Sequence, residues 1–437
     1  MALKNIAILV LTIALCISFC GCGFADNTDD MVAPPELTGE MAPIAQALYN
    51  SAGSSYDLTY PTAGDHRSAI VLEDIDSNGN FEAFAFYSTS DDEMTTMHIN
   101  VICQQDGEWS SVSDQTIVAT GVEMIDFCDL NSNGTQEVLV GWQVNGTSEK
   151  QLTVFSYENG TLTQRLSQPY TSFFCYDLDS NGSNEIFVHL LMPTEKTNKA
   201  MVYNYNDNGM AQTTGCVMDG NVKSAASPVL STLSNGQTAI YIDEIKGVGS
   251  VTEVLCFLKG ELINPLLNVE ASYENTLTLR AAALETKDIN DDGILEIPVA
   301  SELPNAAGDG EKLYYTNWCS FNGEKLTVKL TTVVNTVDGY YLVVPSNMLK
   351  QISVLKDIEK HERKFYRYDS RTQTSSEEIF TLTAISVEKW DDQNFDRGSM
   401  VEITRTKSTV FVVELGEGAA AFSISVDLIK SIFRIVD

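Results

Sequence analysis

Short acidic segments alternate with apolar runs through the middle of the chain. Four nine-residue segments share the pattern Asp-aliphatic-Asp/Asn-x-Asn/Asp-Gly-x-x-Glu, and each continues directly into an apolar run of strand length. An Asn-Gly or Asp-Gly dipeptide, the usual signal of a β-hairpin turn, follows 31 to 35 residues after the first Asp of each segment. The segments are DIDSNGNFE at 74–82, DLNSNGTQE at 129–137, DLDSNGSNE at 177–185 and DINDDGILE at 288–296. This pattern predicts a repeated unit with the order strand, acidic loop, strand, loop, strand, tight turn, strand.

The repeat predicts a mainly β fold. A four-stranded unit of about 50 residues cannot bury both of its faces alone, so neighbouring units must stack on one another. A β-propeller of about five units over residues 40–336 is the simplest closed arrangement, and a solenoid or a sandwich is the alternative. A turn at Lys259-Gly260 marks a unit whose acidic loop we interpret as decayed within residues 242–253. Residues 56–66 and 264–281 leave room for a sixth or seventh unit.

The pattern changes after residue 336. The acidic loops stop, seven Lys and Arg residues gather between positions 350 and 371, and strand-like runs alternate with two short helical segments. Residues 337–437 are therefore predicted to form a small α+β domain. Its basic cluster is either a solvated face or a surface that docks on the acidic repeats or on another anionic partner.

The N-terminal segment is typical of an export signal. Lys4 precedes an apolar run from Ile6 to Phe19, which is short for a bilayer span but fits the core of a signal peptide. The run ends in the sequence FCGCG, which resembles the processing box of bacterial lipoproteins, where a small residue precedes the lipidated Cys. We therefore expect a lipoprotein signal peptide over residues 1–21, lipidation at Cys22 and a polar tether over residues 22–39. An ordinary signal peptide or a retained anchor is the alternative.

The charge balance limits the class of partner. The chain has 27 Lys and Arg residues against 60 Asp and Glu residues, which gives a formal net charge of −33. Nucleic-acid affinity depends largely on the neutralisation of phosphates by Lys and Arg, so nucleic-acid binding is excluded as a function. Cations are the more natural small partners of such a chain.

The residue types of the acidic loops indicate calcium. A loop that presents oxygen ligands at positions one, three and five, with Gly at position six for a sharp turn, is how a chain wraps Ca²⁺. Here the closing acid stands at position nine. Position twelve, where an EF-hand needs a bidentate Glu, is occupied by Ala85, Val140, Val188 and Val299. The pattern therefore excludes the EF-hand and places each loop between two strands.

On these residues, segment 68–335 resembles the FG-GAP/VCBS family of calcium-stabilised propeller repeats, which is also seen in integrin-type heads. The stretches at 60–69 and 275–280 are similar to members of that family found in lipoproteins of Gram-positive anaerobes. The resemblance implies one Ca²⁺ per loop, held by the first, third, fifth and ninth residues. These residues are Asp74, Asp76, Asn78 and Glu82; Asp129, Asn131, Asn133 and Glu137; Asp177, Asp179, Asn181 and Glu185; and Asp288, Asn290, Asp292 and Glu296.

The four loops differ in charge. The loop at 129–137 brings two carboxylates and the others bring three, so we expect it to be the weakest site. The loops depart from the family pattern, because three of the four carry Asn at position five and all carry Glu instead of the commoner Asp at position nine. The alternative is that the loops are turns held by side-chain-to-backbone hydrogen bonds alone. If calcium binds, we expect it to clamp the loops and not to catalyse a reaction.

Other chemistry is not apparent in the sequence. The four His residues include no pair at metal-ligand spacing, and the chain has no GxSxG, HExxH or phosphate-binding Gly-rich motif. No catalytic residue is assigned, and His189, in an apolar run, is expected in the core or at an edge. Cys103, Cys256 and Cys319 occupy equivalent places in different units, so we expect free, buried thiols and a reduced core.

These observations predict a non-enzymatic lipoprotein on the outer face of a bacterial cell membrane. It is expected to be a monomer that uses a calcium-stabilised propeller as a platform for an unidentified protein or glycan. One alternative is an extracellular polysaccharide-active enzyme on a propeller scaffold, which would need convergent carboxylates, His or Tyr outside the calcium loops. Another alternative is a structural or assembly lipoprotein of the cell envelope.

Overall fold

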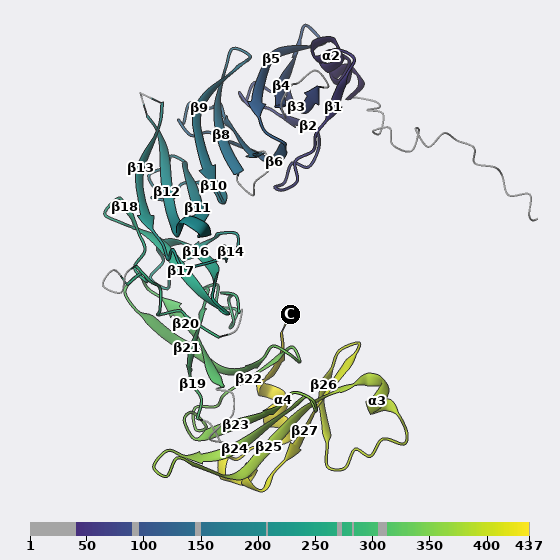
Figure 1. Ribbon diagram of the computed structural model, residues 1–437, viewed down its shortest axis with the longest axis vertical. Helices are drawn as coiled ribbons and strands as arrows, with labels where there is room; N and C mark the ends of the chain where they lie inside the picture. Colours follow the sequence, from purple (N-terminus) through teal and green to yellow (C-terminus); the bar gives the residue numbers. More distant parts are fainter. Residues whose placement is uncertain are drawn as a thin grey trace, which may run out of the picture.

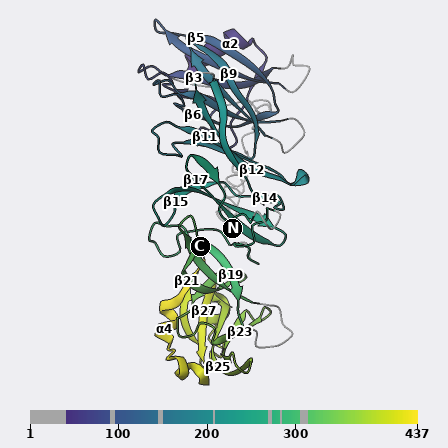
Figure 2. The same cartoon turned by 90° about the vertical axis from the view of Figure 1, so that its left-hand side faces the viewer.

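The structure is a computed structural model that describes residues 41–89, 96–144, 150–206, 209–268, 273–281, 284–304 and 313–436. Within these residues, six antiparallel sheets follow one another along an open arc (Figure 1), and a view turned by 90° shows them stacked along the long axis of the molecule (Figure 2). In this described part of the chain, no helix is long and apolar enough to cross a membrane. The predicted signal peptide, Cys22 and the tether lie outside it.

The first three sheets are built from consecutive strands. Sheet one contains β1 (Tyr56–Leu58), β2 (Ile70–Glu73), β3 (Glu82–Thr89), β4 (Thr96–Gln105) and β5 (Glu108–Val118). Sheet two contains β6 (Gly121–Cys128), β7 (Glu137–Gln143), β8 (Lys150–Glu158) and β9 (Thr161–Tyr170). Sheet three contains β10 (Ser172–Tyr176), β11 (Glu185–Met192), β12 (Thr197–Asn206) and β13 (Gly209–Val217), with the 3₁₀ turn η2 (Pro193–Glu195) between β11 and β12.

The remaining sheets are less regular. Sheet four contains β14 (Ser224–Ala225), β15 (Val229–Thr232), β16 (Thr238–Lys246), β17 (Gly249–Leu258) and β18 (Glu261–Ile263). Sheet five contains β19 (Ile297–Glu302), β20 (Tyr314–Phe321), β21 (Leu326–Asn335), β22 (Tyr340–Val343) and β28 (Phe433–Ile435). Sheet six has the order β23 (Ile352–Asp357), β24 (Glu362–Asp369), β25 (Thr374–Ser386), β27 (Thr409–Leu415) and β26 (Val401–Arg405). The helical segments are α2 (Ala42–Ala52), α3 (Val387–Asp391), α4 (Val426–Ile432) and the 3₁₀ turn η3 (Glu417–Phe422).

The predicted mainly β fold is confirmed. In sheets two to four, the first strand lies toward the inside of the arc and the last strand toward the outside (Figure 1). In sheet one, β1 and β2 pair with successive parts of β3 and together act as one interrupted inner strand, so residues 56–58 belong to this sheet. The described parts of 264–281 form isolated bridges and no strand. Neither segment therefore builds the sixth or seventh repeat that the sequence left open.

Alternate strand residues bury both faces of each sheet. In β3, Phe84 and Phe86 pack toward sheet two against Val140 and Trp142, while Ala83, Ala85 and Tyr87 face the other way. The same two-sided burial continues from sheet two to sheet three, from three to four, and from four to five. Sheets two to five thus each bury apolar side chains against two neighbouring sheets, as stacked repeats require.

Both ends of the stack are covered, so the sheets form an open arc and not the closed ring of the predicted propeller. Helix α2 lays Ile44, Ala47 and Leu48 on the outer face of sheet one, the face that a last blade would need for closure. Positions i, i+3 and i+4 form one apolar stripe on a helix, which explains why α2 fits this role. At the other end, sheets five and six share one apolar cluster. A covered end is what an open repeat array needs for solubility.

Sheet five joins the repeats to the C-terminal part of the chain. The predicted boundary between residues 336 and 337 lies in the turn between β21 and β22, and β22 pairs with β21 on one side and with β28 on the other. Tyr340 of β22 stacks on Phe433 of β28 and contacts Phe411 of β27 edge-on. The last strand of the chain therefore completes a sheet that began before residue 337.

One cysteine pair contradicts the prediction of a fully reduced core. Cys128, at the end of β6, and Cys175, in β10, form a disulfide with a Cα–Cα distance of 6.6 Å. Cys103, Cys216, Cys256 and Cys319 are free. The prediction compared equivalent positions in different units, whereas Cys128 and Cys175 occupy different positions on adjacent inner strands, where the backbones approach closely enough for a bridge.

Candidate metal sites in the acidic loops

All four acidic loops have one backbone conformation. The first Asp of each loop accepts hydrogen bonds from the backbone N–H groups of positions five and six, at distances between 2.7 and 3.2 Å. Position four has a left-handed φ between 55° and 61° in every loop, and the Gly at position six has a φ between 83° and 91°. Residues with a Cβ rarely adopt the second of these conformations, which explains the Gly at position six.

The closing Glu holds the start of each loop. Glu82, Glu137 and Glu185 are the first residues of β3, β7 and β11, and Glu296 directly precedes β19. In each loop one oxygen of this Glu accepts a hydrogen bond from the backbone N–H of position two, at 2.8 to 3.2 Å. All four Glu side chains are almost completely buried. The Glu is therefore fixed by the strand that follows the loop and directed back into it.

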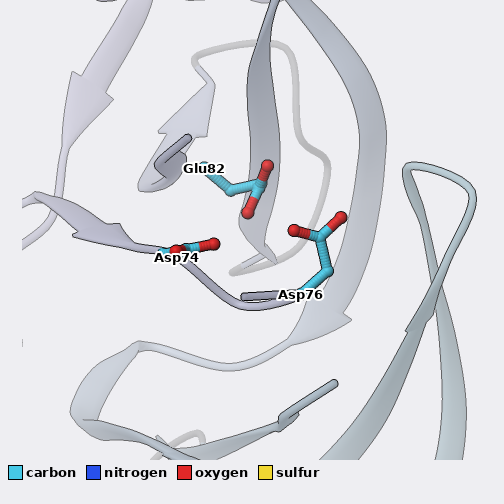
Figure 3. Close-up of side chains that lie close together, drawn as sticks. All are labelled: Asp74, Asp76 and Glu82. Atoms are coloured by element: carbon cyan, nitrogen blue, oxygen red, sulfur yellow. The ribbon is translucent and has the colours of Figure 1, made fainter. Parts of the chain in front are cut away.

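Three of the loops bring three carboxylates together. In the first loop Asp74, Asp76 and Glu82 point toward one another (Figure 3), and one oxygen from each lies within 4.8 Å of the other two. The same grouping is found for Asp177, Asp179 and Glu185 and for Asp288, Asp292 and Glu296. In the last of these, Glu296 Oε1 is buried without a hydrogen-bond partner among the described residues. Clustered carboxylate oxygens of this kind can hold a metal ion, and hard cations such as Ca²⁺ prefer oxygen ligands.

The second loop differs from the others because it brings only two carboxylates. Its Asn131 takes the place of an Asp, and the Asn131 side-chain amide donates a 2.6 Å hydrogen bond to Glu137 Oε1. The loop keeps the same turn, because Asp129 still accepts from the backbone N–H groups of Asn133 and Gly134. With two carboxylates, one of them already paired with an amide, it offers the least negative charge to a cation.

Burial and mutual repulsion disfavour the charged form of the closing Glu. The pKa of Glu82 is raised to about 7, mainly by burial and also by the charges of Asp76 and Asp74, while the hydrogen bond from the backbone N–H of Ile75 opposes the rise. Burial likewise raises the pKa of Glu137 to about 7, with Asp129 adding to the effect. The pKa values of Glu185 and Glu296 are raised for the same reasons. A bound cation would relieve this repulsion, so the loops favour a positive partner.

Sheet four has lost its acidic loop, but at a place different from the one we predicted. Its inner and second strands are joined by the short turn 233–237, where Asn235 caps the turn through Gln237 N–H and Gly236 has a φ of 86°. This turn has no carboxylate. The segment 242–253 that we interpreted as the decayed loop is instead the β16–β17 hairpin. The predicted turn at Lys259-Gly260 is confirmed, because it joins β17 to β18. Asp243, Glu244 and Glu253, however, lie in the strands β16 and β17 and not in a loop.

Those strand acids form a buried polar network that sequence reasoning missed. Asn198 donates to Glu244 Oε1 at 2.7 Å, and His189 Nε2 donates to Asn198 Oδ1 at 2.8 Å. Glu253 accepts from the backbone N–H of Asp219 and from the side chain of Asn275. Burial raises the pKa of Glu244 well above its usual value, and the charge of Glu253 adds to it; burial lowers the pKa of His189. The sequence signal that could have indicated this network is the presence of acidic residues within the apolar runs of β16 and β17.

A second part of the network fixes the chain after sheet four. Arg280 pairs with Asp243 at 3.1 Å and donates to the carbonyl oxygens of Leu284 and Thr278. Lys246 pairs with Asp219 at 2.6 Å and with Glu274 at 3.3 Å. These contacts hold the described part of segment 273–286 against the β16–β17 hairpin.

A cavity of about 640 Å³ opens beside this network. Polar and aromatic side chains from the β12–β13 edge and from the segments at 220 and 273 line it. Asn221 reaches from its wall to Glu274 at 3.1 Å, and Glu274 remains 39% exposed. The lining residues are Lys196, Thr197, Asn198, Lys199, Val217, Met218, Gly220, Asn221, Tyr273 and Glu274.

Comparison with known proteins gives distant likenesses. No protein-family model matches the chain, and no curated protein matches it. Among solved structures, the exotype rhamnogalacturonan lyase YesX is 10% identical with a TM-score of 0.30, over 75% of this chain and 84% of the lyase. A rhamnogalacturonan lyase from Bacillus licheniformis is 9% identical with a TM-score of 0.29, over 82% and 91%. An exo-β-1,3-galactanase from Phanerochaete chrysosporium is 11% identical with a TM-score of 0.25, over 76% and 80%.

These likenesses run against the predicted non-enzymatic binding platform, which we correct here. The similar structures are named as enzymes that act on polysaccharides, which agrees with the first alternative given above. Because all TM-scores are 0.30 or lower, the likeness assigns no activity to this chain. The resemblance to FG-GAP/VCBS repeats stays a prediction based on the loops.

Proposed function

We propose that the acidic loops bind Ca²⁺ and that the bound ions brace the stacked sheets of an extracellular protein. The observation that carries this proposal is the convergence of three carboxylate oxygens within 4.8 Å in three loops of identical conformation. The unpaired, buried Oε1 of Glu296 supports it, because an unpaired buried carboxylate oxygen is costly. The residues that would hold the ions are the sixteen side chains named in the sequence analysis, with the loop at 129–137 the weakest site.

Calorimetric titration with CaCl₂ tests this proposal. We expect binding at roughly 0.1–1 mM, the range of extracellular calcium modules. The substitution Asp288→Ala should remove one binding event, whereas Asn235→Ala, in the acid-free turn of sheet four, should remove none. Titration with MgCl₂ should give weaker binding, because Mg²⁺ requires a tighter octahedral site and loses its water reluctantly. Absence of heat and of any stabilisation up to 10 mM CaCl₂ would contradict the proposal.

We further propose that the protein acts on an extracellular polysaccharide at the cavity beside sheet four. The cavity combines the ring of Tyr273, the amide of Asn221 and the partly exposed carboxylate of Glu274, which are the groups that hold sugar rings and hydroxyls and that serve as acids or bases in glycoside cleavage. Glu274 is the carboxylate among the lining residues, and its position is set by Lys246 and Asn221.

Release of reducing or unsaturated ends from a panel of purified acidic and neutral polysaccharides tests this second proposal. We expect Glu274→Gln to lower turnover at least ~100-fold, the usual contribution of a general acid or base. The matched control is Glu359→Gln, an exposed Glu that lies between β23 and β24. Equal turnover by the two variants, or turnover of no polysaccharide by the wild-type chain, would contradict the assignment.

We also propose that the chain is exported and anchored by lipid on Cys22 at the outer face of the cell membrane, as a monomer. The Cys128–Cys175 disulfide supports export, because such bonds persist mainly in oxidising compartments. Labelling of the cells with a fatty-acid analogue is expected to mark the wild-type protein and the Cys20→Ala variant but not Cys22→Ala. Equal labelling of both variants would contradict the assignment of Cys22.

A further inference from the structure

The first three acidic loops contact one another, and the residue at position eight makes the contact. In the second loop this residue is Gln136. Its backbone N–H donates to the carbonyl oxygen of Ile75 at 2.8 Å, and its side-chain amide donates to Glu73 at 2.9 Å. Both acceptors belong to the neighbourhood of the first loop, because Glu73 directly precedes Asp74 and Ile75 is position two. The second loop is therefore attached to the first.

The third loop repeats this arrangement on the second. Its position eight is Asn184, and the Asn184 side-chain amide donates to the backbone carbonyl oxygen of Asp129 at 3.2 Å. Ser183 and Ser132 place their hydroxyl oxygens 3.4 Å apart across the same boundary. The Cys128–Cys175 disulfide joins the strands that lead into these two loops. Three loops from three sheets thus form one hydrogen-bonded row.

Position eight is apolar where no acidic loop precedes. The first loop has Phe81 there, which is 55% exposed, and it follows no other acidic loop. The fourth loop has Leu295, which packs in the apolar cluster between sheets four and five. The turn of sheet four that precedes this loop instead binds the β20–β21 hairpin, through Ser234 and Asn235. An amide therefore stands at position eight only in the two loops that have an acidic loop before them.

The amides at position eight directly precede the closing Glu, so they can couple calcium binding in one loop to the preceding loop. Gln136 directly precedes Glu137, and Asn184 directly precedes Glu185. The closing Glu also bonds to position two of its own loop. An ion that fixes the closing Glu would therefore also fix the neighbouring amide. Through this amide it would fix Glu73, which directly precedes the first loop, or Asp129, the first residue of the second loop. Gln136 and Asn184 are positioning residues in this scheme and touch no ion.

We propose that the loops beginning at Asp74, Asp129 and Asp177 bind calcium cooperatively through Gln136 and Asn184, while the loop beginning at Asp288 binds independently. This inference rests on the proposed calcium function. The second loop, with two carboxylates, is the middle member of the row and gains most from filled neighbours. Site-to-site coupling typically changes an affinity by about 5- to 150-fold, so filling of the third loop should raise calcium affinity at the second loop by at least ~5-fold.

Calcium titrations of residues 23–437 test the proposal by comparing two variants, each of which lacks one proposed site. Asp177→Ala is expected to remove the third site and also to weaken the second site by at least ~5-fold. Asp288→Ala is expected to remove one site and to leave the other affinities unchanged. Equal losses from the two substitutions, one site each with nothing else altered, would overturn the coupling.

A second comparison assigns the coupling to the amides. The variant with Gln136→Leu and Asn184→Leu keeps every proposed ligand and the backbone bond from residue 136 to Ile75. It should therefore bind the same number of ions with a Hill coefficient reduced toward one. Asn184→Gln, which keeps an amide, should restore part of the cooperativity. Phe81→Gln, which adds an amide where no loop precedes, should change nothing. A wild-type Hill coefficient of one with calcium bound would overturn this inference alone, whereas no binding at all would overturn the calcium function.

Discussion

The third and fourth sheets differ in the loop that joins the inner strand to the second strand. In sheet three, the inner strand β10 is joined to β11 by eight residues that carry Asp177, Asp179 and Asn181, and Glu185 opens β11. In sheet four, β15 is joined to β16 by the five residues 233–237, without a carboxylate. Both connections use a Gly with a left-handed φ. Two strands of this fold can therefore be joined without acids, and the longer acidic loops need another reason.

The two sheets also place their buried acids differently. Sheet three keeps its acids at the loop, where the oxygens converge and one face of the group is exposed. Sheet four buries Glu244 and Glu253 inside strands, where Asn198, Asn264 and Asn275 pair with them. The first arrangement suits an exchangeable cation, and the second suits a permanent polar core. The difference leads to four predictions, taken here from the largest expected effect to the smallest.

The largest loss of stability is expected from a substitution in the buried polar network of sheet four. Arg280 is almost completely buried and pairs with Asp243, so Arg280→Ala leaves a carboxylate that is only 15% exposed without its charged partner. This substitution should lower the free energy of unfolding by about 3–5 kcal/mol, with or without calcium. Urea denaturation followed by circular dichroism measures the change. A loss below about 1 kcal/mol would show that the network is dispensable.

The next largest effect is expected to distinguish the acidic loop of sheet three from the acid-free turn of sheet four by the calcium dependence of stability. In saturating calcium, Asp177→Ala should lower the free energy of unfolding by about 2.7 kcal/mol, the contribution of a ligand at one hundred times its dissociation constant. Without calcium the loss should be much smaller. Asn235→Ala, at the turn of sheet four, is the matched control and should cost the same in CaCl₂ and in EDTA. The comparison fails if the two substitutions show the same dependence on calcium.

The buried acid of sheet four should give the protein a pH dependence. Because the pKa of Glu244 in the folded chain is raised, its contribution is fully present below the unfolded pKa of about 4.3 and is lost as the pH rises through the folded pKa. Stability should therefore fall by up to about 1.4 kcal/mol per pH unit in that window. Denaturation at several pH values should show this slope in the wild type and a smaller one in Glu244→Gln. An unchanged slope would assign the titration to another group.

The smallest effect concerns the second loop. Asn131→Asp adds a third carboxylate, so this loop should match the composition of its neighbours. We expect its calcium affinity to rise about tenfold, which corresponds to about 1.4 kcal/mol. The same change should cost stability in EDTA, because it adds a negative charge beside Asp129 and Glu137. A calorimetric titration checks the affinity, and equal affinity in the two proteins would contradict the dependence on charge.

The sequence predicted the loops and the sheets well because both are local. The Asx-x-Asx-Gly spacing sets the turn, and the strand after each loop positions the closing Glu, so Asp74 and Glu82 meet without any distant contact. The end of the stack was not predictable in this way. Whether sheet one meets a last blade depends on Ile44 and Leu48 of α2, which pack on it from outside the repeat.

The parts that were missed depend on contacts between distant segments. Cys128 and Cys175 are bridged because two inner strands lie side by side, and the spacing of the cysteines alone does not contain that information. Glu253 and Asn275 meet across a connection that has no motif. The decayed loop was misplaced for a similar reason, since the acids at 243 and 244 suggested a loop but belong to β16.

Thermal unfolding of residues 23–437 in CaCl₂, in MgCl₂ and in EDTA tests the central claim most directly. The account predicts a rise of the midpoint in millimolar calcium, a smaller rise in magnesium, and loss of the calcium effect when Asp74, Asp177 and Asp288 are all replaced by Ala. A midpoint that is the same in all three solutions, or a calcium effect that survives the triple substitution, would contradict it. The acidic loops would then be turns held by hydrogen bonds, as the turn of sheet four is.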